Sequence, residues 1–191
     1  MEAALRCVLP TLLPEGITFA IYTSQGKHAL IRDLPIRLAG YRSYLRPNWR
    51  IVVVVDRDDE DCRELKSQLE GFSRQAGLVT KTMAGTGAWQ VANRLAIEEL
   101  EAWFFGDMDA VRAAYPRVSA TVERGAAYRD PDAIGGGTCE ALERVLQHAG
   151  YFKGGLRKTE AARAIAAHLD PSRNRSRSFQ VFRDSISPLA P

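Results

Sequence analysis

The feature that most constrains this fold is a run of five β-branched residues, Ile51 to Val55, bounded by turn-forming residues. A continuous apolar run of this kind is typical of a strand buried on both faces of a parallel sheet. Parallel strands need crossover connections, which are usually helices. The run therefore predicts an α/β fold.

The segments around this run alternate between strand and helix patterns. Periodicity and turn residues predict helices over 2–13, 29–44, 60–75, 98–105, 107–114, 138–149, 159–168 and 178–186, and strands over 17–22, 51–55, 78–83 and from residue 89 toward 97. We expect a parallel sheet flanked by helices within residues 1–115. Residues 116–191 are expected to form a helical C-terminal extension packed on that domain.

Composition excludes several classes of protein. The 191 residues are 46% hydrophobic, which is enough for a core, but no apolar stretch approaches the roughly 20 residues of a spanning helix. Residues 1–14 lack the features of a secretory signal, so a cytoplasmic protein is expected. Cys7, Cys62 and Cys139 are odd in number and widely spaced, which argues against a disulfide framework and a zinc site.

An acidic stretch, residues 56–61, follows the predicted buried strand. Ligands of open parallel sheets bind at the carboxyl ends of strands. Asp56 and Asp58 lie two residues apart there, and both carboxylates can converge on a hard cation, Mg²⁺ or Mn²⁺. The alternative is that the acids cap the next helix, a role that we expect of Asp59 or Asp61. For Asp56 and Asp58 the pattern favours metal binding.

A second acidic group opens a later helix. Glu98 and Glu101 share a helix face because they are three residues apart. Carboxylates also stabilise the positive end of a helix dipole, which is the role that we expect of Glu99. Glu98 and Glu101 become catalytic candidates if the fold brings them near Asp56.

Basic residues are concentrated toward the C-terminus. The net charge is +3, yet residues 151–191 hold eight Lys or Arg against three acids. Arg173, Arg175 and Arg177 alternate with hydroxyl residues and could hold phosphates, although an ordinary solvated loop fits the same pattern. Lys27, after Gln25 and Gly26, could receive a phosphate at a helix start or lie in a tight turn. Lys158 is a further basic residue that we expect to contact nucleic acid, together with Lys27 and the three arginines.

Four segments together resemble a bacterial domain of unknown function, number four-two-seven-six. They are Gln25 to Lys27, Asp56 to Cys62, Ala96 to Asp107 and Lys158 to Phe179. The resemblance covers essentially the whole chain, and Glu99 to Phe104 is its most specific part. That family is similar to the TOPRIM superfamily, which includes topoisomerase and primase domains and the nucleases of overcoming-lysogenization-defect proteins.

The TOPRIM resemblance implies a compact parallel sheet with a Mg²⁺ site, in which Asp56 and Asp58 match the metal-binding aspartate pair. It also implies a glutamate for proton transfer at the end of a first strand. Family members usually carry that strand before the helix that starts here at Glu2, so we expect the first strand and its glutamate to be missing from this chain.

The resemblance implies a Mg²⁺-dependent nuclease or nuclease-like subunit that hydrolyses nucleic-acid phosphodiesters, in a phage-defence setting with an ATPase protein partner. The main alternative is a non-catalytic interaction or regulatory subunit of that partner, which the missing glutamate favours. A third hypothesis is a Mg²⁺-dependent phosphohydrolase acting on small phosphates.

Overall fold

A computed structural model describes residues 1–186 of the chain, which form two compact units. Unit 1 combines Met1–Ile21 with the chain from Ala96 onward, and unit 2 is Tyr22–Leu95. Unit 2 is therefore inserted in the sequence of unit 1. The predicted boundary near residue 115 stays a prediction.

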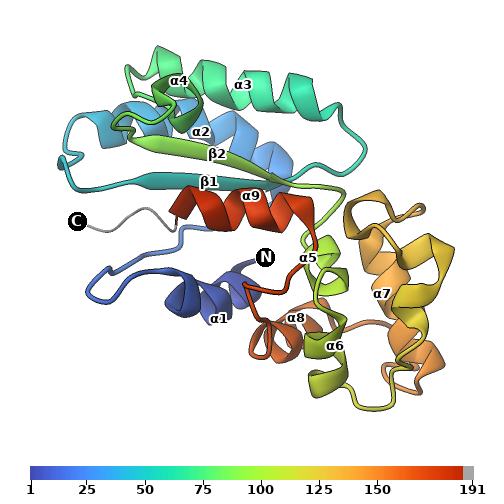
Figure 1. The fold of residues 1–191 in the computed structure, drawn as a ribbon. Coiled ribbons are helices and arrows are strands. Elements are labelled where there is room, and N and C mark those ends of the chain that lie inside the picture. The colour runs from blue at the N-terminus through green and yellow to red at the C-terminus, as the bar shows by residue number, and fades with distance from the viewer. Residues whose placement is uncertain (187–191) are drawn as a thin grey trace. The chain divides into compact units, whose positions relative to one another are not determined.

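Unit 2 contains the sheet. Its elements are α2 (Gly26–Arg42), β1 (Ile51–Asp56), α3 (Cys62–Gln75), α4 (Lys81–Ala84) and β2 (Val91–Ala96), whose last residue belongs to unit 1. β1 and β2 form a small parallel sheet, and α2 and α3 run alongside it (Figure 1). The predicted α/β class, with a parallel sheet flanked by helices, is confirmed at this level.

The core of unit 2 joins the sheet to the two long helices. Val53 and Val55 of β1 are buried with Leu38 of α2 and Leu69 of α3, both of which are fully buried. The remaining residues of β1 are half-buried, so the strand alternates between more and less buried positions. The predicted burial of β1 on both faces is thus only partial.

Two predicted strands do not form. Residues 17–22 have no regular structure, and Ile17, Phe19 and Tyr22 are exposed. The segment 78–83, predicted as a strand, forms only one parallel bridge, between Thr80 and Val91. The Thr80 hydroxyl instead accepts a hydrogen bond from the Met83 N–H, which caps α4. Residues 17–22 alternate apolar residues correctly but lack the pairing partner that a strand requires, whereas α4 takes up the second half of 78–83.

Unit 1 is helical. Its helices are α1 (Glu2–Leu12), α5 (Glu101–Phe105), α6 (Met108–Ala114), α7 (Thr138–His148), α8 (Lys158–Ala166) and α9 (Arg177–Ile186), with short 3₁₀ turns at Val122–Arg124, Ala126–Tyr128 and Pro131–Ala133. The predicted helices are confirmed with small shifts at their ends, except that the helix predicted from residue 98 begins at Glu101. Among the residues described, no helix has the length and apolarity to cross a bilayer.

The core of unit 1 is built around Trp103. Its ring stacks on Phe182 at a centroid distance of 4.9 Å and meets Phe179 edge-on at 5.3 Å. Its indole N–H donates to the Ser178 hydroxyl at 3.0 Å, and its carbonyl accepts from the Asn174 amide at 2.8 Å. Asn174, just before α9, and Ser178, in its first turn, are therefore part of the core and bond to Trp103 of the Glu99 to Phe104 block.

Gly106 makes this packing possible. The Arg175 N–H donates to the Gly106 carbonyl at 2.9 Å. A Cβ at position 106 would collide with the Asn174 side-chain oxygen and would lie 2.8 Å from the Ser176 nitrogen. Only glycine lets the two backbones approach this closely.

Candidate functional site

The candidate site lies in unit 2, where β1 ends at Asp56 and the chain turns into α3. Asp61 is the N-cap of α3 and accepts hydrogen bonds from the N–H groups of Arg63 and Glu64 at 2.8 and 3.0 Å. Those backbone hydrogen bonds, with Glu64 first and Arg63 next, lower the pKa of Asp61. The expected helix-capping role of Asp61 is confirmed.

Lys27, in the first turn of α2, binds the acidic loop. Its ammonium lies 2.7 Å from Asp58 Oδ2 and 2.8 Å from Glu60 Oε1, and it donates to the Arg57 carbonyl at 2.9 Å. Burial alone would lower the pKa of Lys27, but the hydrogen bonds and charges of Asp58 and Glu60 outweigh it, so the pKa is raised. A cationic group thus occupies the position between two carboxylates.

The backbone is unusual at Asp58 and Glu98. Among the residues described, three non-glycine residues have a positive φ, and Asp58 (51°) and Glu98 (58°) are two of them. Each comes two residues after a strand ends, at Asp56 and Ala96 respectively. Such conformations cost free energy and are concentrated at functional sites, where the surrounding structure maintains them. Both residues are candidates that the sequence predicts independently.

The donor chemistry of the loop fits a hard cation. Asp56, Asp58 and Glu60 offer carboxylate oxygens, the ligands that Mg²⁺ prefers in proteins. In the described part of the chain, however, no group of three or more His, Cys, Asp or Glu side chains is arranged to hold a metal ion. The loop provides suitable atoms, and the Lys27 ammonium holds the position between two of them.

Replacing Lys27 by methionine tests whether lysine and a metal compete for these carboxylates. Lys27→Met removes a positive charge within 3 Å of both Asp58 and Glu60. We expect the Kd for Mg²⁺ or Mn²⁺, measured by calorimetric titration, to fall about tenfold because the repulsion of a divalent ion disappears. Lys27→Arg, which keeps the charge, is the matched control, and weaker metal binding by Lys27→Met would contradict competition.

The other predicted acids belong to unit 1. The Glu99 carboxylate accepts from the Cys139 N–H at 2.7 Å and the Thr138 hydroxyl at 3.3 Å, at the start of α7. Glu99 therefore stabilises a helix start as expected, although of α7 and not of its own helix. Because Asp56 and Asp58 lie in unit 2 and Glu98 and Glu101 in unit 1, a shared acidic pocket stays a prediction.

Lys158 lies beside the same acidic segment of unit 1. A hydrogen bond with the Cys139 thiol, followed by the charges of Glu99 and Glu101, raises the pKa of Lys158 despite its partial burial. Lys158 also lines a pocket of about 630 Å³ on α8. The lining residues are Arg157, Lys158, Thr159, Glu160, Arg163 and Ala164.

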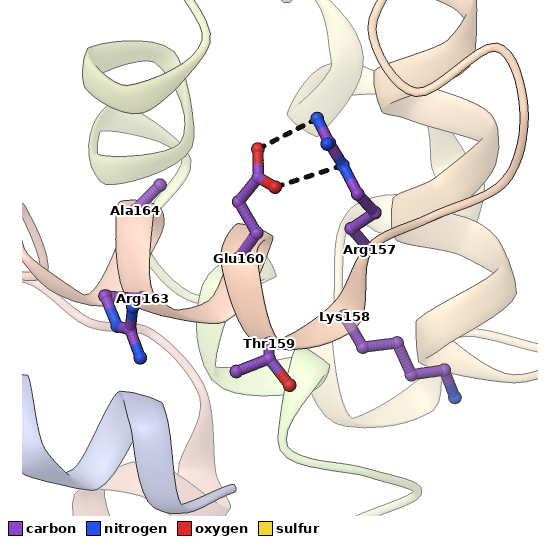
Figure 2. Close-up of a pocket in the computed structure, with 6 residues that line it drawn as sticks. All are labelled: Arg157, Lys158, Thr159, Glu160, Arg163 and Ala164. Atoms are coloured by element: carbon purple, nitrogen blue, oxygen red, sulfur yellow. Dashed lines mark hydrogen bonds and ion pairs between the residues drawn. The ribbon is translucent and has the colours of Figure 1, made fainter.

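One of the two arginines that line this pocket, Arg157, is paired with Glu160. Figure 2 shows Arg157 pointing toward Glu160, with Nε 3.0 Å from Oε2, while Lys158 points away from the pair. Both partners are largely exposed, so the pair contributes little stability.

The tail arginines have different environments. Arg173 Nε lies 2.7 Å from Asp107 Oδ1, and Arg173 also pairs with Asp170 at 3.4 Å. Arg175 and Arg177 are exposed. Nucleic-acid binding by these three arginines stays a prediction. Because Arg173 is paired with Asp107 and Asp170, Arg175 and Arg177 are the more accessible of the three.

Sequence reasoning missed a buried polar cluster in unit 2. The Glu70 carboxylate lies 2.8 Å from Lys66 Nζ and accepts from the Asn93 amide at 3.1 Å, and Asn93 also donates to Ser73 at 3.2 Å. Burial, the largest effect, lowers the pKa of Lys66. The spacing of Lys66 and Glu70 by four residues signals the ion pair, but nothing in the sequence signals its burial.

The family model of a domain of unknown function, DUF4276, matches residues 1–187. The chain belongs to the DUF4276 family. The DUF4276 match includes the acidic loop after β1, the Glu99 to Phe104 block and the tail before α9, so the family expected from these residues is confirmed. No curated protein and no solved structure matches the chain.

Proposed function

We propose that this chain is a TOPRIM-like nuclease that hydrolyses nucleic-acid phosphodiesters with the help of Mg²⁺ or Mn²⁺. The observation that carries the proposal is Asp58, which sits in a left-handed backbone conformation at the carboxyl end of β1 with its carboxylate on a lysine ammonium. Strain and a pre-assembled cationic contact at a strand end are typical of a functional site.

The residues of the loop have distinct roles in this proposal. Asp56 and Asp58 hold the divalent cation, which would stabilise charge on the phosphate and activate a water. Lys27 keeps Asp58 and Glu60 together and provides a positive charge for a substrate phosphate. The TOPRIM resemblance suggests phage defence and an ATPase partner as the setting.

Thermal unfolding of the full chain with Mg²⁺ or Mn²⁺ tests the metal site. A cation that binds only the folded state at 100 times its Kd adds about 2.7 kcal/mol to the free energy of unfolding. We therefore expect the Tm of the wild-type chain to rise by several degrees and that of Asp56→Ala with Asp58→Ala to stay constant.

Asp33→Ala is the control for this experiment. Asp33 is an acid of unit 2 on α2, where it pairs with Arg32. Its variant should respond to the cation like the wild type. A metal-induced Tm shift that survives loss of both aspartates would place the cation elsewhere and contradict the proposal.

A non-catalytic interaction subunit is the second candidate, and the Lys27 contacts favour it. The ammonium already compensates two carboxylates of the loop, so the loop is stable as an ion-pair cluster without a metal. If this candidate is right, neither Mg²⁺ nor Mn²⁺ changes the Tm of the wild-type chain, and the wild-type chain cleaves neither single-stranded nor duplex nucleic acid.

A further inference from the structure

The amino-terminal side of β1 in unit 2 is strongly basic. Between Leu34 and Val55 the chain carries four arginines and no aspartate or glutamate. All acids of the 56–61 loop follow at the other end of β1. Since α2 and β1 run in opposite directions (Figure 1), the end of α2 and the start of β1 share the basic side of unit 2.

Large aromatic rings are exposed on this side. Tyr22, Tyr44 and Trp49 are 71%, 57% and 44% exposed. The Tyr41 ring links two of them, with centroid distances of 6.5 Å to Tyr22 and 5.8 Å to Tyr44. Rings of this size are usually buried, so a row of exposed ones indicates a binding surface.

Arginines accompany the rings. Arg37 precedes Tyr41 by one helical turn and so lies on the same face of α2. Arg46 places its guanidinium 5.2 Å from the Trp49 ring centroid. Tyr44 and Arg46 are two residues apart, so their Cα atoms lie within about 7.6 Å. We call Tyr22, Arg37, Tyr41, Tyr44, Arg46 and Trp49 the aromatic-arginine face.

We propose that the aromatic-arginine face binds single-stranded nucleic acid, with bases stacked on the exposed rings and phosphates paired with the arginines. Unpaired bases offer a π-face to Tyr44 and Trp49, whereas the bases of a duplex are stacked on each other. The absence of acids among residues 34–55 complements the uniform negative charge of a phosphate backbone.

The inference names the substrate class of the proposed nuclease and rests on the proposed function only in that respect. Binding at the aromatic-arginine face needs no metal. It also does not involve Asp56 or Asp58, which lie at the opposite end of β1. Binding and cleavage can therefore fail separately.

The test is fluorescence anisotropy of a labelled oligothymidylate of about 16 nucleotides, titrated with the full chain in EDTA. We expect Tyr44→Ala and Trp49→Ala each to weaken binding about tenfold, because each removes one stacking platform. Ile36→Ala is the matched control, since Ile36 is a 78% exposed apolar residue of α2 outside the aromatic-arginine face. It should bind like the wild type.

The arginines and the type of nucleic acid give further readouts. Arg46→Gln should reduce the slope of log affinity against log salt by about 0.7, the value for one phosphate contact on a single strand. Oligouridylate in place of oligothymidylate distinguishes RNA from DNA. A duplex of the same length should bind more weakly than either.

Three results would overturn the inference. The first is oligonucleotide binding by the Tyr44→Ala, Trp49→Ala double variant that is as tight as wild-type binding, and the second is tighter binding of duplex than of single strands. The third is that neither the wild type nor the double variant binds oligonucleotide and the wild type forms an oligomer that the double variant does not form. That result would make the face a protein interface. Binding in EDTA without any cleavage in Mn²⁺ would support the face and contradict only the nuclease.

Discussion

Phosphodiester cleavage by the full chain is expected to fall about a thousandfold when Asp56 and Asp58 are both replaced by asparagine. The substitutions keep the shape of the side chains but remove the negative charge that attracts a divalent cation. Losing a metal removes several kcal/mol of transition-state stabilisation, and about 4 kcal/mol corresponds to this factor. Initial rates on a labelled single-stranded substrate in Mn²⁺ measure it.

Asp59→Asn is the matched control for this pair of substitutions. Asp59 lies in the same loop and is exposed, and it has no assigned role in metal binding. Its variant should cleave at the wild-type rate. Equal losses in Asp59→Asn and in the double variant would show that only the total charge of the loop matters, which would refute a specific role for Asp56 and Asp58.

The second large effect is expected at Asp107, in unit 1. Its side chain is 1% exposed and pairs with Arg173 at 2.7 Å, while accepting the N–H groups of Asp170 at 2.8 Å and Ala110 at 3.2 Å. Asp107→Ala removes the acceptor of the Asp170 N–H and the nearest carboxylate of Arg173, whereas the Ala110 N–H keeps the Asp107 backbone carbonyl at 3.0 Å. We expect the free energy of unfolding to fall by about 2–3 kcal/mol, less than the roughly 3–5 kcal/mol for fully buried pairs, because Arg173 is 42% exposed.

Urea denaturation followed by circular dichroism measures this loss. Asp109→Ala provides the control. Asp109 lies two residues after Asp107 and also pairs with an arginine, Arg112, but its side chain is 64% exposed. Its loss should leave the urea midpoint nearly unchanged. A similar destabilisation by both variants would show that the charge of the segment, and not the buried contacts of Asp107, is what matters.

Local sequence patterns predicted the helices and β1 well. The spacing of Leu65 and Leu69 identifies α3, and Asp61 is recognisable as its cap, because both signals act within a few residues. The strand predicted at residues 17–22 failed because a strand also needs a distant partner. The position of the acidic loop after β1 was enough to predict it as a candidate site. Its ion pair with Lys27 could not be predicted from periodicity, because Lys27 and Asp58 are 31 positions apart in the sequence.

The tail before α9 shows the same limit. Its alternating arginines and hydroxyls fit a solvated loop, yet Asn174, Ser176 and Ser178 are buried. Ser176 and Ser178 donate to the Asp132 carboxylate at 2.8 and 2.9 Å, more than forty residues away. Polar side chains can be buried where hydrogen-bond partners are present in the folded protein, and partners this far away in the sequence are identified only from the structure.

The insertion of unit 2 into unit 1 has a consequence for synthesis on the ribosome. Residues 22–95 are contiguous, so unit 2 can reach its native state as soon as it has emerged. Helix α1 emerges earlier still but packs on α8, and the hydrogen bond from the Cys7 thiol to the Arg163 carbonyl joins residues 156 positions apart. The apolar side of the amphipathic α1 therefore stays uncovered until α8 has been synthesised. During that interval α1 exposes an apolar segment of the kind that nascent-chain chaperones bind.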